Sequence, residues 1–395
     1  MRLILAYSGG LDTSVMVRWL SEKGYEVITY TADVGQGEEL SQIPQKAKAS
    51  GAIEAIVEDL KEEFANSFCL PTLRALALYE GKYPLSASLS RPLIAKRLVH
   101  FAKEFGAKAV AHGSTGKGND QVRFELSVWA LDPSLEVIAP FREWEFRSRE
   151  EEVDYAMRFN IPVKVSREKP YSIDKNLWGI SIECGPIEDI SLEPPEDAFE
   201  ITKPVEKTPE APTYIEIEFF EGKPVKLNSQ DFKLHELIAK LNTIAGENGF
   251  GRIDMVESRL VGIKSREVYE APGALVLYEA YRDILSTVLD RHSFHYLLSH
   301  ISHEYARIVY EGLWFTPLRE ALDAFCERLA KRATGKVRLK LQRGSLRVVG
   351  RESPYSLYSD ELATYSPKDS FDHRDGGAFC RVFGLPMKLL GKTQC

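Results

Sequence analysis

The first 165 residues alternate between short apolar runs and segments with helical periodicity, and this alternation constrains the fold more than any other feature of the chain. It predicts strands at 2–7, 25–32, 52–57, 108–112 and 136–139, and helices at 12–23, 39–50, 92–105, 120–131 and 148–159. Pro92 and Gly106 occupy the positions expected for the first residue of a helix and for its C-cap. Strands that alternate with helices form a parallel sheet with helices on both faces, so we predict a doubly wound α/β domain over 1–165.

The pattern changes beyond this domain. Residues 186–212 are acidic and rich in proline, which predicts an extended connection. A strand at 214–220 and a hairpin at 337–349 then mix with helices at 232–244, at about 274–310 with one break, and from Thr316 onward. We therefore predict a second, α+β unit over 166–365, followed by a polar, glycine-containing tail at 366–395.

The composition favours a cytoplasmic globular protein. Hydrophobic residues make up 44% of the chain and charged residues 28%, and the net charge of −7 argues against a general nucleic-acid coat. No apolar run approaches the roughly 20 residues that span a bilayer, and residues 1–7 are too short for a signal peptide. The five cysteines lack a C-x-x-C spacing, which argues against a disulfide framework or a zinc ribbon: Cys69, Cys184, Cys326, Cys380 and Cys395.

The sharpest motif follows the first predicted strand and opens the first predicted helix. It consists of Ala6, Tyr7, Ser8, Gly9, Gly10, Leu11, Asp12, Thr13 and Ser14. The two glycines allow a tight turn whose N–H groups face an anion, and the helix N-terminus adds partial positive charge. Asp12 fits beside phosphates if Mg²⁺ bridges its carboxylate and a pyrophosphate. The alternative is a glycine turn in which Asp12 serves only the helix dipole.

A second polar loop follows the fourth predicted strand, at 112–125. Thr115, Asn119, Asp120 and Arg123 offer a hydroxyl, an amide, an anion and a cation within nine residues. This set suits an amino acid, with Asp120 for an ammonium, Thr115 and Asn119 for a carboxylate, and Arg123 for a second carboxylate. Each loop follows the carboxyl end of a parallel strand, so we expect both loops at the same edge of the sheet. The alternative is a surface loop before a helix with a solvated Arg–Glu face.

Both loops resemble known motifs. S-G-G-x-D-[ST] resembles the PP-loop of N-type ATP pyrophosphatases, which have an adenine nucleotide alpha hydrolase-like fold; no Walker A pattern occurs. T-G-K-G-N-D-Q-V-R-F-E at 115–125 is similar to the signature of the argininosuccinate synthase family. Further similar segments lie at 82–85, 91–92, 176–181, 251–257, 264–270, 310–314 and 350–358, so the resemblance covers roughly residues 1–390.

The family resemblance implies a reaction and a set of ligands. Citrulline and aspartate would be joined through a citrullyl-adenylate, with release of AMP and pyrophosphate, Mg²⁺ accompanying ATP. ATP would be bound by residues 6–14, Ala32 and Gly113, and aspartate by Thr115, Asn119 and Asp120. Citrulline would be bound by Tyr83, Ser88, Asn119, Arg123, Ser172, Ser181, Glu257 and Tyr269. Catalytic roles would fall to Asp12, Asp120 and Arg123. The enzyme would be a homotetramer that binds small-molecule substrates and neither nucleic acid nor a membrane.

Other interpretations remain open at this point. Taken alone, Glu257 and Tyr269 fit a helix salt bridge and a half-buried tyrosine equally well. A PP-loop tRNA thiolase would need a catalytic cysteine pair and basic appendages, whereas a nucleotide sensor would leave Arg123 unexplained. A histidine group at 292–303 matches no metal-binding spacing, and the basic hairpin at 337–349 fits a solvated face better than an RNA site.

Overall fold

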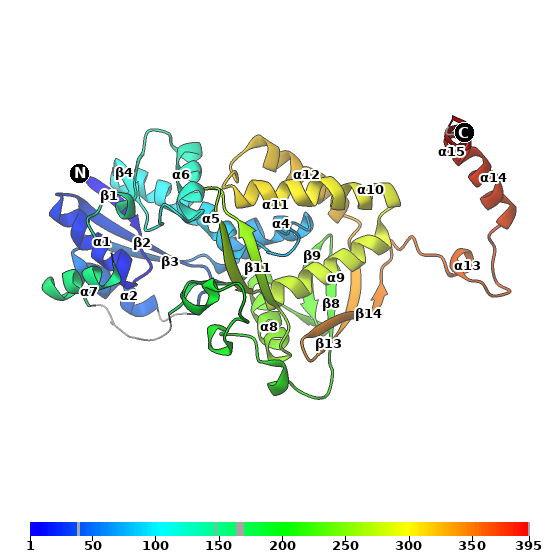
Figure 1. The fold of residues 1–395 in the computed structure, drawn as a ribbon, viewed down its shortest axis with the longest axis horizontal. Helices are drawn as coiled ribbons and strands as arrows, with labels where there is room; N and C mark the ends of the chain where they lie inside the picture. The colour runs from blue at the N-terminus through cyan, green and yellow to red at the C-terminus, as the bar shows by residue number, and fades with distance from the viewer. Residues whose placement is uncertain (38–39, 147, 163–169, 394–395) are drawn as a thin grey trace.

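The N-terminal domain is built on a five-stranded parallel sheet (Figure 1). The computed structural model describes residues 1–37, 40–146, 148–162 and 170–393. The strands are β1 (Arg2–Ala6), β2 (Glu26–Asp33), β3 (Glu54–Asp59), β4 (Ala109–Ala111) and β5 (Glu136–Ile138), in the order β3-β2-β1-β4-β5. All five predicted strands are confirmed. The order reverses at β1, so the loops after β1 and β4 flank the position where parallel sheets bind ligands.

Helices cover both faces of this sheet, as the alternation of side chains along β1 requires. Leu3 and Leu5 pack in one apolar cluster, which includes residues of α1 (Leu11–Glu22) and α2 (Ile43–Ser50). Ile4 points to the opposite face and joins the larger cluster with α5 (Ser86–Phe105) and α6 (Asp120–Leu131). The doubly wound α/β class is therefore confirmed. The predicted helix at 39–50 begins at a residue, Glu39, that lies outside the described residues.

The predicted start of α5 at Pro92 is wrong, because the helix begins six residues earlier, at Ser86. Proline inside a helix removes one backbone hydrogen bond, so the sequence favours a start there. Contacts from distant residues stabilise the extra turns: the Ala87 N–H donates to the Tyr83 hydroxyl (2.9 Å), and the Ser86 carbonyl accepts from Asn176 Nδ2 (2.8 Å). The short helices α3 (Lys61–Phe64) and α4 (Leu70–Arg74) precede α5.

The C-terminal unit contains two antiparallel sheets. One has the order β10-β9-β8-β13-β14 and the other β11-β12-β7-β6. Their strands are β6 (Ser172–Asn176), β7 (Gly179–Glu183), β8 (Thr213–Phe220), β9 (Lys223–Leu227), β10 (Gln230–Asp231), β11 (Arg252–Ser258), β12 (Lys264–Glu270), β13 (Gly335–Gln342) and β14 (Ser345–Glu352). The predicted strand and hairpin correspond to β8 and to β13–β14, whereas the second sheet was not predicted.

Helices complete this unit. They are α8 (Leu234–Glu247), α9 (Pro272–Val288), α10 (Arg291–Tyr296), α11 (Ser302–Tyr310) and α12 (Pro317–Ala330), with a π-helical segment at Leu297–Ile301. The predicted long helical region is confirmed, with its break between α9 and α10, where Asp290 caps α10 through its side chain. Thr316 likewise caps α12, as its position before Pro317 predicts.

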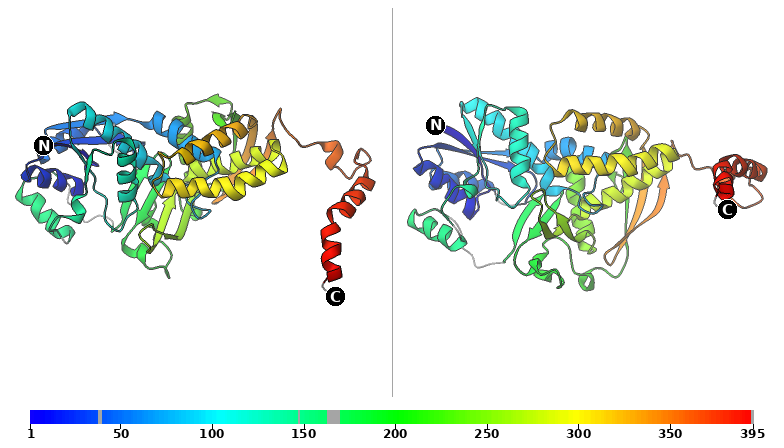
Figure 2. Two further views of the ribbon diagram at one scale, coloured as in Figure 1. Left: turned by 90° about the horizontal axis from the view of Figure 1, so that it is seen from above. Right: turned by 45° about the horizontal axis from the view of Figure 1, so that its top comes forward.

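The C-terminal tail projects away from the rest of the molecule (Figures 1 and 2). α13 (Asp360–Ala363) lies just before the predicted tail at 366–395, which carries α14 (His373–Phe383) and α15 (Leu385–Thr393). Exposed apolar side chains lie on α14 and α15, among them Phe379, Phe383 and Leu389, although the tail reads as polar. Cys395 and the predicted boundary at 165–166 lie outside the described residues. Among the helices that are described, none has the length and apolarity needed to cross a membrane.

Candidate functional site

A cavity of about 1030 Å³ opens where the loops after β1 and β4 meet the second unit. Both of the predicted loops line it, together with residues of β6, β7, β11 and β12. It brings together Ala6, Tyr7, Ser8, Gly9, Gly10, Leu11, Asp12, Thr13, Ala32, Tyr83, Gly113, Thr115, Asn119, Asp120, Arg123, Ser172, Ser181, Glu257 and Tyr269. Two candidates do not line it: Ser14 is buried and shares a hydrogen bond with the Tyr7 hydroxyl (2.9 Å), and Ser88 is fully buried.

The loop after β1 presents its backbone to the cavity. Gly9 has φ +80°, so a side chain there would be strained, and its Cβ atom, 2.3 Å from Ile43 Cδ1, would also displace the end of that side chain. The Ser8 and Thr13 hydroxyls are 3.0 Å apart across the loop. No side chain in the described part of the chain caps the N-terminus of α1, which leaves its first N–H groups available to an anion.

Asp12 is exposed beside a buried glutamate. Glu152 of α7 (Arg149–Arg158) is 8% exposed and hydrogen-bonds Asp12 through its side chain. Burial and the adjacent Asp12 carboxylate raise the pKa of Glu152 from 4.5 to about 8. At neutral pH the Glu152 carboxyl is therefore protonated. It donates a hydrogen bond to Asp12, which fixes the direction of the Asp12 carboxylate.

We expect Glu152→Gln to change how stability depends on pH. The unfolded chain releases the Glu152 proton near pH 4.5, whereas the folded protein holds it to about pH 8. The folded state binds more protons between these values, so the parent loses stability as the pH rises through this window. Glutamine does not titrate, so the Tm of the variant should fall less than that of the parent between about pH 5 and about pH 8, as measured by thermal unfolding without nucleotide.

The matched control is Glu150→Gln, which changes an exposed glutamate of the same helix whose pKa is lowered and not raised. It should keep the pH dependence of the parent. Parallel Tm profiles for the parent and Glu152→Gln would show instead that Glu152 is ionised in the folded protein.

The loop after β4 is fixed by its own helix. Gln121 Nε2 donates to the carbonyls of Gly116 (2.6 Å) and Gly118 (3.1 Å), and Gln121 Oε1 accepts from Arg142 Nη2 (2.6 Å). A Cβ atom on Gly113 would lie 3.3 Å from side-chain atoms of both Met16 and Thr13, so the two loops are in close contact there. The predicted common edge is thus one continuous surface.

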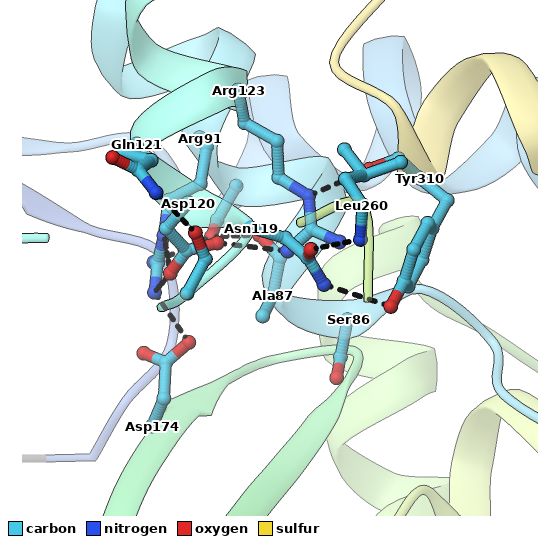
Figure 3. A network of polar contacts seen from close by, with 12 residues as sticks. Ser86, Ala87, Arg91, Asn119, Asp120, Gln121, Arg123, Asp174, Leu260 and Tyr310 are labelled. Carbon is cyan, nitrogen blue, oxygen red and sulfur yellow. Dashed lines mark hydrogen bonds and ion pairs between the residues drawn. The ribbon is translucent and has the colours of Figure 1, made fainter. Parts of the chain in front are cut away.

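A chain of alternating charges crosses the base of the cavity (Figure 3). Arg91 bridges Asp120 (2.7 Å) and Asp174 (2.6 Å), and Asp120 also pairs with Arg123 Nη1 (2.8 Å). Burial acts to raise the pKa of Asp120, but the charges of Arg91 and Arg123 outweigh it and lower the pKa to about 2. Asp120 is therefore a permanent anion that already accepts from two guanidinium groups.

Two of the residues that line the cavity carry a buried polar atom without a hydrogen-bond partner in the described part of the chain. Arg123 is 4% exposed, and its Nη2 has no hydrogen-bond partner among the described residues; neither has Ser181 Oγ. Buried polar groups nearly always have partners, so these two atoms are candidates for contact with a ligand, in which an acceptor would suit the guanidinium. Ser88 Oγ is also unpartnered within the described chain, but Ser88 does not line the cavity.

Glu257 and Tyr269 belong to the same wall. Glu257 is 3% exposed and accepts hydrogen bonds from the hydroxyls of Tyr269 (2.6 Å) and Tyr310 (2.7 Å). The Tyr269 ring stacks on Tyr83, with 4.0 Å between centroids. Burial raises the pKa of Glu257, against the opposing effect of the two hydroxyls and Arg123. A buried carboxylate of this kind is suited to an ammonium, so the ligand interpretation fits better here than a helix salt bridge.

Several charged residues of the cavity, and one tyrosine beside it, were not predicted. They are Arg91, Asp174, Tyr310 and a cluster on β7 and β12 in which Arg259 pairs with Glu183 and Glu267, each at 2.5 Å. Burial, followed by the charge of Glu183, raises the pKa of Glu267 to about 7. Arg91, Glu267 and Tyr310 lie in segments that resemble the family, at 91–92, 264–270 and 310–314, but the resemblance assigned them no role. Across the described ranges, no group of three or more His, Cys, Asp or Glu side chains is arranged to hold a metal ion.

Comparisons with known proteins match the whole chain. The family model described as the arginosuccinate synthase N-terminal HUP domain matches residues 2–162, and the one described as the C-terminal domain matches residues 171–390. The chain is 71% identical to the argininosuccinate synthase of Aquifex aeolicus and 52% identical to that of Carboxydothermus hydrogenoformans. Each alignment covers 100% of this chain and 98% of the relative.

Proposed function

The chain belongs to the argininosuccinate synthase family, and from this premise we propose how its own residues carry out the reaction. The enzyme is a carbon–nitrogen ligase of arginine biosynthesis that uses ATP to join L-citrulline to L-aspartate. We further propose that it acts in the cytoplasm as a homotetramer, with the exposed apolar side chains of α14 and α15 covered by other subunits.

ATP takes the nucleotide end of the cavity. The backbone of residues 6–14 and the N-terminus of α1 hold the pyrophosphate part, with Ala32 and Gly113 beside the rest of the nucleotide. The exposed Asp12 carboxylate fits Mg²⁺, which binds in proteins through one or two carboxylates together with substrate phosphates. When bound, Mg²⁺ neutralises charge on the departing pyrophosphate. Asp12 is held for this role by the protonated Glu152.

Citrulline binds against the wall of the cavity to which both units contribute residues. Its carboxylate meets the free Arg123 Nη2, its ammonium meets Glu257, and Ser181 Oγ accepts or donates a further bond. Tyr83, Asn119, Ser172 and Tyr269, which line the cavity, complete the site, whereas the buried Ser88 lies outside it. The unpartnered Arg123 Nη2 is the observation that carries this assignment, because a buried guanidinium N–H without an acceptor in the described chain is available to the carboxylate of a ligand.

Aspartate takes the remaining space beside the loop after β4. Thr115 and Asn119 bind a carboxylate, and Asp120 binds the ammonium. A carboxylate has about four acceptor positions, so Asp120 can accept this bond in addition to those from Arg91 and Arg123. Asp120 and Arg123 then lie between the two amino acids, which is the basis of their proposed catalytic roles.

The reaction has two displacements. The ureido oxygen of citrulline attacks the α-phosphorus of ATP, a new O–P bond forms, and the bond to pyrophosphate breaks. The amine of aspartate then attacks the ureido carbon, and AMP leaves with the oxygen that it acquired. No covalent bond to the protein is required, so the residues of the cavity contribute by positioning the reactants and stabilising charge.

Pyrophosphate exchange tests this scheme. We expect labelled pyrophosphate to enter ATP when citrulline is present and aspartate is absent, because the adenylate forms first. With both amino acids, the spent nucleotide should be AMP and no tRNA should be needed. Chromatography showing mainly ADP would contradict adenylation, and binding of ATP without turnover would favour a nucleotide sensor.

A further inference from the structure

Tyr310 connects the two proposed amino-acid sites from outside the cavity. It is the last residue of α11, it is 1% exposed, and it is not among the residues that line the cavity. Its hydroxyl lies 2.7 Å from Asn119 Nδ2 and 2.7 Å from Glu257 Oε1. Figure 3 shows the Tyr310 hydroxyl against the Asn119 amide. Asn119 belongs to the N-terminal domain and Glu257 to β11, so one oxygen atom joins a substrate residue of each unit.

The directions of these hydrogen bonds are fixed by their neighbours. The Leu260 N–H donates to Asn119 Oδ1 (2.9 Å), so Asn119 must present its Nδ2 to Tyr310. The Tyr310 oxygen then accepts, and its own proton goes to Glu257 at 2.7 Å in preference to the Ser258 carbonyl at 3.2 Å. Tyr269 donates to the other oxygen of Glu257, so both carboxylate oxygens are oriented.

The same residue also supports Arg123. The Tyr310 carbonyl accepts from Arg123 Nε (3.0 Å), and the guanidinium carbon lies 4.8 Å from the centroid of the Tyr310 ring. The other face of the ring stacks on Tyr79, with 3.5 Å between centroids. Removal of the hydroxyl alone therefore leaves the ring, the carbonyl and the Arg123 contacts in place.

We propose that the Tyr310 hydroxyl is a positioning group that orients the Asn119 amide and the Glu257 carboxylate together, and so prepares both amino-acid sites. The identity of the two substrates rests on the proposed function. The hydroxyl acts through Asn119 and Glu257 and does not itself touch a substrate. It makes no hydrogen bond to the residues proposed to hold ATP, all of which the structure describes. Loss of the hydroxyl should therefore weaken amino-acid binding and spare ATP binding, whereas a general loss of structure would weaken both.

Tyr310→Phe tests the proposal in the full-length enzyme. We expect the KM values for citrulline and for aspartate each to rise by about fivefold to twentyfold, as for loss of a hydrogen bond to a charged group. The KM for ATP should stay within about twofold and kcat within about threefold, because neither the nucleotide loop nor the reacting atoms are altered.

Tyr305→Phe is the matched control on the same helix. Its hydroxyl is also buried and donates to a carboxylate, Asp323 (2.7 Å), away from the cavity, so the variant loses the same kind of bond and should keep all three KM values. Unchanged KM values in Tyr310→Phe, or an equal rise that includes ATP, would overturn the proposal. A parent enzyme that makes no argininosuccinate in the same assay would overturn the proposed function instead.

Discussion

The variant Asp12→Asn is expected to fold normally, and its kcat is expected to fall about 10²-fold to 10³-fold. This is the effect of removing one preorganised charge that stabilises a transition state. The asparagine is nearly the same size, but it cannot offset the charge of a metal-bound pyrophosphate. Asp12 is exposed at the cavity, and the asparagine oxygen can still accept the hydrogen bond from the buried Glu152, so the fold should be kept. The measurement is kcat at saturating Mg²⁺ and substrates, with circular dichroism to verify the fold.

Asp132→Asn provides the comparison for this change. Asp132 follows α6 and accepts from the Ser134 hydroxyl (2.6 Å), and it does not line the cavity. This variant should have the activity of the parent. If Asp12→Asn also stayed within about twofold of the parent, the carboxylate would serve only the dipole of α1.

Asp120→Ala is expected to separate the two chemical steps. Truncating one partner of a buried charge pair costs about 2–5 kcal/mol, so argininosuccinate formation should fall by about 30-fold to several thousand-fold. Citrulline-dependent pyrophosphate exchange should fall less, by about tenfold at most. Glu257 is unaltered and Arg123 still donates to the Tyr310 carbonyl, so both residues remain able to bind citrulline. That residual loss reflects Arg91 and Arg123, which both lose a counter-charge.

Asp283→Ala is a suitable control, because Asp283 pairs with Arg351 through two bonds of 2.7 and 2.8 Å outside the cavity. It should alter neither step. An equal fall of both steps in Asp120→Ala, with the fold intact, would assign Asp120 to ATP or to the scaffold, and the proposed aspartate site would be misplaced.

The sequence predicted the N-terminal domain well because its signals are local. Apolar runs, glycines and prolines mark each strand and helix within a few residues, and two loops after parallel strands necessarily meet at one edge. The fold class and the two loops at the cavity follow from this argument, although Ser14 packs against Tyr7. The remaining candidates for the amino-acid sites were named only by the family resemblance, and of these Ser88 is buried away from the cavity: Tyr83, Ser88, Ser172, Ser181, Glu257 and Tyr269.

The features that were missed depend on contacts between distant residues. Asn119 and Tyr310 are 191 positions apart, and Arg91 and Asp174 are 83 positions apart. The early start of α5 likewise depends on Asn176, which lies 90 positions beyond Ser86. Periodicity and motif spacing carry no information about such pairs, and a tail with apolar residues on one helical stripe reads as polar when only its composition is counted.

Bonds from Leu260 and Tyr310 join the amino-acid sites across the two units, whereas the Ser8–Thr13 contact of the nucleotide loop lies within one domain. Leu260 and Tyr310 contact Asn119, and Tyr310 contacts Arg123, so a hinge rotation of one unit would break these bonds in a single event. The contacts around Ser8 and Thr13 lie within one domain and would survive it. An opened enzyme would therefore still bind nucleotide but would no longer discriminate among amino acids. Closure would restore the selectivity for both amino acids in one step.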